Sequence, residues 1–131
     1  MNSEELKTRK RGFALRIIRL AESLPEAPAA KVIRNQLLRC RSSIGANYRA
    51  ACRARSKADF VSKMGIVEEE ADETIYWMEL LIDAGIVKQS RMAELLDEAG
   101  QILSIVISSI KTAKGIRANP QSAISDQKSY A

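Results

Sequence analysis

The sequence predicts an all-α protein built as an antiparallel, up-down-up-down four-helix bundle. Its 131 residues are rich in Ala, Leu, Ile, Arg and Glu, and only 5% of them are aromatic. Sustained alternating runs of the kind that form strands are missing. Apolar residues instead recur three and four positions apart over four segments of similar length, which is the spacing of one helix face. Short breaks separate the segments, and short connections place consecutive helices antiparallel.

The first two helices are expected at residues 3–24 and 28–54. The second opens with Pro28, a residue favoured at the first position of a helix because its missing N–H has no partner there in any case. The apolar stripe of the first segment is Leu6, Phe13, Ile17, Leu20, Ala21 and Leu24. The stripe of the second is Ile33, Leu37, Cys40, Ile44, Asn47 and Ala51.

The third and fourth helices are expected at residues 57–84 and 91–114. Ser56 followed by Asp59 resembles a capping box, Ser90 is the expected N-cap of the last helix, and Gly115 is its expected end. The third stripe is Phe60, Met64, Val67, Ala71, Thr74, Met78, Leu81 and Gly85, and the fourth is Leu96, Ala99, Leu103, Val106, Ile110 and Ala113. Residues 1–116 then form one bundle domain, and polar residues 117–131 form a flexible tail.

The helices carry more apolar residues than one buried seam needs. Those outside the stripes include Val32, Leu38, Tyr48, Ile66, Ile75, Trp77, Ile82, Leu95, Ile102, Ile105 and Ile107. A second apolar face usually meets another subunit, although scattered aliphatic residues are also common on surfaces. We expect a homo-oligomer.

Four residues of the second and third apolar stripes, Ile44, Asn47, Phe60 and Thr74, are expected to be structural seam residues. A buried Asn commonly sets helix register at some cost in stability. Because Asn47 follows Gly45-Ala46, a close helix crossing or a backbone contact is the other interpretation. Thr74 is a candidate hydrogen-bond partner for Asn47.

Charge is segregated between the second and third segments. Residues 28–55 contain no acidic residue, residues 57–84 are mostly acidic among their charged positions, and the whole chain has a formal charge of +5. The arginines of the second helix either pair with carboxylates of the third helix or of another subunit, or bind the phosphates of a nucleic acid. The candidate nucleic-acid-binding residues are Lys10, Arg11, Arg34, Arg41, Arg49, Arg53 and Arg55.

No catalytic constellation stands out. The chain has no histidine, which excludes the Glu-x-x-His di-metal pattern of helical bundles and the histidine-based triads. Neither a Gly-rich phosphate loop nor a Cys-x-x-Cys pair is present. We therefore expect no enzymatic activity, no metal, no cofactor and no small-molecule substrate.

The protein is expected in the cytoplasm, away from membranes. Cys40 and Cys52 lie in one expected helix, about 18 Å apart at the usual rise, which is beyond disulfide reach. Both are expected as buried or half-buried thiols in a reducing compartment. The charged N-terminus has no apolar signal core, and no apolar run is long enough to span a bilayer.

Several strings in the middle of the chain resemble a known bacterial family. They are Gln36-Leu37-Leu38-Arg39, Ser42-Ser43-Ile44-Gly45-Ala46-Asn47-Tyr48-Arg49-Ala50-Ala51, Ser56-Lys57-Ala58-Asp59-Phe60 and Ile66-Val67-Glu68-Glu69-Glu70-Ala71-Asp72-Glu73. The chain resembles the four helix bundle proteins first found as reading frames in intervening sequences of 23S rRNA genes, a family sometimes labelled ribosomal. The resemblance extends from about Leu6 to about Lys114.

The resemblance implies an antiparallel bundle that assembles as a ring, a homopentamer. The accessory variability protein of diversity-generating retroelements is similar in fold, and it forms a basic barrel that binds nucleic acid and a reverse transcriptase. Together with the charge, this leads us to expect binding of structured RNA through arginines of the first two helices. The alternative is a scaffold whose charged helices serve its own assembly, with no nucleic-acid binding.

Overall fold

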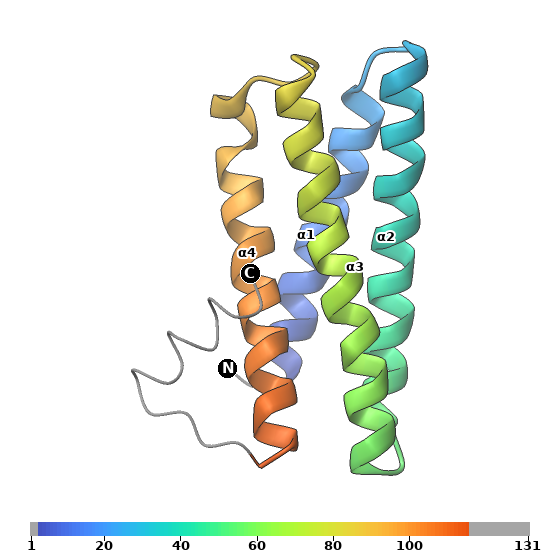
Figure 1. The fold of residues 1–131 in the computed structure, drawn as a ribbon, viewed down its shortest axis with the longest axis vertical. Coiled ribbons are helices and arrows are strands. Elements are labelled where there is room, and N and C mark those ends of the chain that lie inside the picture. Colours follow the sequence, from blue (N-terminus) through green and yellow to red (C-terminus); the bar gives the residue numbers. More distant parts are fainter. Residues whose placement is uncertain (1–2, 116–131) are drawn as a thin grey trace.

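The computed structural model describes residues 3–115, and these fold into four α-helices joined by short loops (Figure 1). The helices are α1 (Ser3–Ser23), α2 (Pro28–Cys52), α3 (Lys57–Asp83) and α4 (Gln89–Ala113). No strand occurs within the described range. The prediction of an all-α protein with four helices is confirmed. The expected tail, residues 117–131, lies outside the described residues.

Local signals in the sequence account for most helix ends. Pro28 begins α2, and the hydroxyl oxygen of Ser56 accepts a hydrogen bond from the backbone N–H of Asp59 at the start of α3 (3.0 Å). Gly85 follows α3 and Gly115 follows α4, both with positive φ (74° and 78°), a conformation that glycine adopts without steric cost.

The expected start of α4 is wrong by two residues. The helix begins at Gln89, its N-cap is Lys88, and no side chain caps it. Ser90 therefore lies inside the first turn. Lys88 has the extended backbone conformation of an N-cap residue (φ −71°, ψ 139°), but no side chain accepts a hydrogen bond from the first turn.

The four helices lie side by side along their length (Figure 1). The loops at residues 24–27 and 84–88 lie at one end of the molecule, and the loop at residues 53–56 lies at the other (Figure 1). The closest packing is between α2 and α3 and between α3 and α4. Helix α1 packs less closely against its two neighbours, α2 and α4.

The core runs the length of the bundle and takes apolar residues from all four helices. Ile17, Leu37, Met64 and Leu81 are among its large, fully buried side chains. Three residues of α4 that were assigned to a second, outward face also lie in this core, namely Leu95, Ile102 and Ile107. That assignment is wrong, because α4 is covered on more of its circumference than one seam requires.

Three large apolar side chains remain clearly exposed among the described residues: Leu15, Val32 and Tyr76. They are on α1, α2 and α3, respectively. Within residues 3–115, no helix is both long enough and apolar enough to cross a membrane.

Candidate nucleic-acid interface

A pocket of about 480 Å³ opens between α1 and the C-terminal half of α2. Its walls come mainly from those two helices, and its floor reaches Ala71 and Thr74 of α3 and Ala99 and Ile102 of α4. The complete lining is Lys7, Lys10, Arg11, Phe13, Ala14, Ile17, Arg41, Ile44, Gly45, Tyr48, Arg49, Cys52, Arg53, Ala71, Thr74, Ala99 and Ile102. We call this the α1–α2 pocket.

Small side chains create the pocket. Ala14, Gly45, Ala71 and Ala99 line it from four different helices, and each leaves volume that a larger residue would fill. A Cβ atom at position 45 would meet no heavy atom of a neighbouring element within 4 Å. Gly45 therefore marks an opening between helices, and the alternative interpretation of Gly45-Ala46 as a close helix crossing is wrong.

The rim of the pocket is basic. Lys7, Lys10 and Arg11 contribute from α1, and three arginines, Arg41, Arg49 and Arg53, from α2 and its C-cap. No acidic side chain of residues 3–115 lines it. Five of the seven predicted nucleic-acid-binding residues thus come together in one place. The rim is an electropositive site of a kind that attracts phosphate.

Three of these arginines face solvent without an anionic partner. Arg11, Arg49 and Arg53 are exposed, and none of them forms an ion pair with a carboxylate in the part of the chain that the structure describes. Lys7 is different, since its ammonium group lies 3.4 Å from Glu4. The guanidinium groups are available to an external anion.

Lys10 is half-buried at the edge of the pocket. Its Nζ atom lies 3.6 Å from the centre of the Tyr48 ring, a cation–π contact. Burial lowers the pKa of Lys10 to about 8, with the nearby Cys52 opposing and the charge of Lys7 adding to the shift. Burial also raises the pKa of the Tyr48 hydroxyl, helped by its hydrogen bond with Cys52.

Arg41 brings an unsatisfied donor into the lining. Its Nε atom is buried and has no hydrogen-bond partner among the described residues, while one Nη atom makes only a long contact (3.4 Å) with the hydroxyl of Ser42. A buried donor without a partner costs about 1–3 kcal/mol.

The other two predicted residues lie elsewhere. Arg55 is exposed in the loop between α2 and α3, at the same end as Arg53 but outside the pocket lining. Arg34 lies near the start of α2, about 22 Å from Arg49 along the helix. Its guanidinium donates to the carbonyl oxygens of Ala21 (3.1 Å), Leu24 (3.1 Å) and Pro25 (3.3 Å) and to Glu26 (3.3 Å). Arg34 therefore holds the α1–α2 loop.

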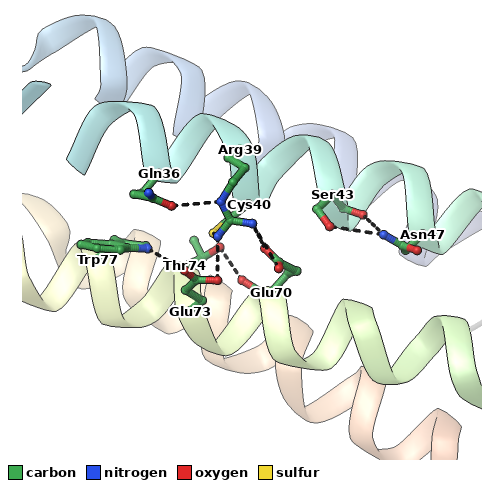
Figure 2. Close-up of polar contacts among 9 residues, drawn as sticks. All are labelled: Gln36, Arg39, Cys40, Ser43, Asn47, Glu70, Glu73, Thr74 and Trp77. Carbon is green, nitrogen blue, oxygen red and sulfur yellow. Dashed lines mark hydrogen bonds and ion pairs between the residues drawn. The ribbon is translucent and has the colours of Figure 1, made fainter. Parts of the chain in front are cut away.

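One arginine, Arg39, makes the ion pairs between the basic helix α2 and the acidic helix α3 (Figure 2). Its guanidinium contacts Glu70 at 2.9 Å and Glu73 at 2.7 Å, and it also donates to the Cys40 sulfur at 3.2 Å. The hydrogen bond from Arg39 holds the pKa of Glu73 below its usual value. Ion pairs between α2 and α3 thus form, but they are made by Arg39 and not by the arginines predicted to bind nucleic acid.

Cys40, Glu70 and Glu73 are also close enough to hold a metal ion. The Arg39 guanidinium already bonds all three (Figure 2). Burial raises the pKa of the Cys40 thiol to about 12, which disfavours the thiolate that a metal would need. The cluster is best described as an ion-pair site between α2 and α3.

The seam residues behave differently from one another. Ile44 and Thr74 are buried, whereas Asn47 and Phe60 are half-buried. Asn47 donates to the carbonyl and hydroxyl oxygens of Ser43 (2.9 and 3.2 Å), and Thr74 donates to the carbonyl of Glu70 (2.8 Å; Figure 2). The expected Asn47–Thr74 bond is therefore absent among the bonds of the described residues.

Tyr48 takes the buried position next to Asn47, at 5% exposure. An aromatic ring gains more from burial than an amide does, and an amide is costly to bury without complete hydrogen bonding. The two cysteines also separate: Cys40 is buried, Cys52 is exposed, and both are free thiols. The expectation of burial is thus wrong for Cys52.

A signal for the pocket was present in the sequence. On α1 the lining residues Lys7, Lys10, Ala14 and Ile17 are spaced three and four apart, and Arg41, Gly45, Tyr48 and Cys52 on α2 have the same spacing. Each set therefore occupies one helix face. The α1 face carries two lysines and the α2 face one arginine, and each face has a small residue, Ala14 or Gly45, between larger ones. Neither face was identified as a pocket wall from the sequence.

These features define a class: a small four-helix protein with a basic pocket between two of its helices. Residues 4–108 match the family described as 23S rRNA-intervening sequence protein. The chain belongs to this family, and the resemblance seen in the sequence is confirmed.

A solved structure from Bacteroides thetaiotaomicron is similar over most of the chain. It is described as a protein with unknown function from the S23 ribosomal protein family. The two chains share 37% sequence identity, and the similarity covers 85% of this chain and 99% of that chain with a TM-score of 0.78. No curated protein matches the chain.

Proposed function

We propose that this protein is a non-enzymatic nucleic-acid-binding bundle, with structured RNA as its ligand. In this proposal the up-down-up-down bundle is the subunit of a homo-oligomeric ring, a pentamer. Phosphates of the RNA are bound by Lys10, Arg11, Arg41, Arg49 and Arg53 around the α1–α2 pocket, with Arg55 beside them. Arg34 is not included, because its donors are used by the α1–α2 loop.

One observation carries the proposal: six basic side chains converge on one pocket that no acidic side chain of residues 3–115 lines. Some arginines elsewhere in the described part of the protein are paired with carboxylates, as Arg9 is with Glu98 (2.9 Å) and Arg39 is with Glu70 (2.9 Å). Unpaired arginines gathered in one place indicate an external anion. Guanidinium groups bind phosphate in a bidentate manner, which favours a nucleic acid.

The test is filter binding of an RNA hairpin over a range of salt concentrations. We expect affinity that falls steeply as salt rises, because each bound phosphate releases counterions. The double variant Arg49→Glu/Arg53→Glu should bind more weakly, and its slope of log K against log salt should be shallower by about two. The control is Arg19→Glu/Arg91→Glu, the same charge change at two exposed arginines outside the pocket.

Two results of this experiment would contradict the proposed function or the role of the pocket. No binding at low salt, or binding that salt does not weaken, contradicts the proposal. Equal weakening by the two double variants would mean that only net charge matters and that the pocket has no special role.

A second function is favoured by a separate observation. Four acidic residues on α3, Glu69, Asp72, Glu79 and Asp83, are exposed, and their spacing places them on one helix face. This acidic stripe is complementary in charge to the basic rim, so a second copy could dock the stripe onto the pocket. The protein would then be a scaffold whose charges serve its own assembly.

The two functions predict different results for one variant. In the scaffold, Arg49→Glu loosens the oligomer as measured by light scattering, and RNA does not bind at any salt concentration. In the nucleic-acid-binding protein, Arg49→Glu weakens RNA binding and leaves the oligomer's mass unchanged.

A further inference from the structure

The α1–α2 pocket has two chemically different parts. Its rim is basic, as described above, and its interior is lined by small and apolar side chains that include Ala14, Ile44, Ala99 and Ile102. Its volume of about 480 Å³ is in the range of pockets that hold small ligands or single groups of larger ones. A surface that binds only a phosphate backbone needs cations and no apolar pocket. The apolar interior therefore indicates that an apolar part of the ligand enters the pocket.

Two cations of the lining, Lys10 and Arg41, form no ion pair with a carboxylate among residues 3–115. Lys10 carries its charge at a half-buried position beside Lys7, and burial disfavours that charge. An anionic group at the mouth of the pocket would stabilise the charges of both side chains.

We propose that the α1–α2 pocket takes up an unpaired nucleotide of the bound nucleic acid, with the base inside and its phosphates on the basic rim. This inference rests on the proposed function and makes it more specific. A nucleotide combines a flat, largely apolar base with a phosphate, and this combination matches the two parts of the pocket. In a duplex the bases are stacked and paired, and taking one out of the stack costs a few kcal/mol, so an unpaired base enters a protein pocket more readily.

Gly45 offers a substitution that fills the pocket and removes no charge. It lines the pocket, lies on an exposed part of α2, and a Cβ atom at this position would have no neighbouring heavy atom within 4 Å. Gly45→Leu should therefore fold, since leucine is a far better helix former than glycine. Gly12→Leu is the matched control, because Gly12 is an exposed helical glycine with equally open space that does not line the pocket.

The experiment compares a fluorescein-labelled 12-nucleotide single strand of RNA with a blunt 12-base-pair RNA duplex by anisotropy at low salt. We expect the wild type to prefer the single strand. Gly45→Leu should weaken single-strand binding at least tenfold and change duplex binding less than twofold. Gly12→Leu should change neither. Circular dichroism confirms that each variant is folded.

Adenosine monophosphate is the third probe, since the same chemistry is present in a free nucleotide. A site for a nucleotide within a strand should bind it at least a hundredfold more weakly than the 12-mer, because one phosphate meets few of the rim cations. Comparable affinity for the two would overturn the assignment to a strand.

A second variant protects the test against a folding defect in the first. Ala14→Leu fills the same pocket from α1 and should reproduce the selective loss of single-strand binding. A 4-thiouridine in the strand should crosslink to lining residues such as Phe13 or Tyr48. Crosslinks confined to surfaces outside the pocket would overturn the inference.

The outcomes separate this inference from the proposed function. If neither RNA binds at low salt, the proposed function fails. If both bind and Gly45→Leu has no selective effect, the function stands and the pocket inference is wrong. If Gly45→Leu lowers the oligomer's mass and leaves RNA binding unchanged, the occupant is a second copy of the chain and the inference is also wrong.

Discussion

The arginines of α2 are divided by their surroundings into residues that hold the protein together and residues open to a ligand. Arg34 binds the carbonyl groups of the α1–α2 loop, and Arg39 bonds the carboxylates of α3. Arg49 and Arg53 face solvent beside the pocket. A guanidinium group suits all of these environments, so residue type alone did not distinguish them. The distinction comes from what the neighbouring helix or loop offers each side chain.

Lys10 should make nucleic-acid binding depend on pH above about 8. Its pKa in the free protein is lowered to about 8, and a bound phosphate raises it because the anion favours the charged form. Affinity is then highest below pH 8 and falls as the pH rises above 8. We expect weaker binding of the single-stranded RNA at pH 9 than at pH 7, measured by anisotropy at constant ionic strength.

Lys10→Arg is the control for this pH dependence, because arginine remains charged throughout the range. The groups that act on Lys10 are Lys7 on α1 and Tyr48 and Cys52 on α2, while Glu4 acts on Tyr48. All four remain in the variant. An equal fall in affinity for wild type and variant would assign the effect to one of those groups and contradict the role of Lys10.

At the scale of the element, the start of α3 depends on one hydrogen bond from Asp59 N–H to the Ser56 hydroxyl (3.0 Å). Ser56→Ala removes this cap and should lower the free energy of unfolding by about 1 kcal/mol. Urea denaturation followed by circular dichroism measures the change. Ser90→Ala is the matched control, since Ser90 lies within the first turn of α4 and no side chain caps that helix. Equal loss in both variants would contradict the capping role.

Sequence periodicity predicts the elements of this protein well and the site less well. The spacing of apolar residues places the helices to within a few residues, because each helix buries one face whatever its neighbours are. Tyr48 is buried in place of Asn47, and the space at Gly45 is open. Both features depend on how the four helices pack against one another, and no periodicity within one helix specifies that packing.

At the scale of the whole molecule, the largest basic and acidic surfaces described above lie on different helices. The basic rim belongs to α1 and α2, and the exposed acidic stripe belongs to α3. A surface with both signs in separate places is suited to head-to-tail contacts, and such contacts close into rings when the rotation between copies allows it. The same basic rim would then serve either a neighbouring subunit or a nucleic acid, so assembly and binding are best measured on the same variants.

We expect substitution of Tyr76 to weaken self-assembly more than substitution of any other side chain. It lies in the middle of the acidic stripe, is 55% exposed, and is held in place by an edge-on contact with Trp77 (4.9 Å between ring centres). Exposed aromatic residues are enriched at protein interfaces, where they bury large apolar area. Tyr76→Asp should therefore lower the mass measured by light scattering on nuclease-treated protein toward the 14.5 kDa of one chain.

The matched control for this last variant is Ser108→Asp, which introduces the same charge at an exposed position of α4. It should leave the mass at the wild-type multiple of 14.5 kDa. A wild type that is already a monomer contradicts the proposed ring directly. A wild-type oligomer that Tyr76→Asp leaves intact would move the interface away from α3, to a face that carries Leu15 or Val32, the other exposed apolar side chains of residues 3–115.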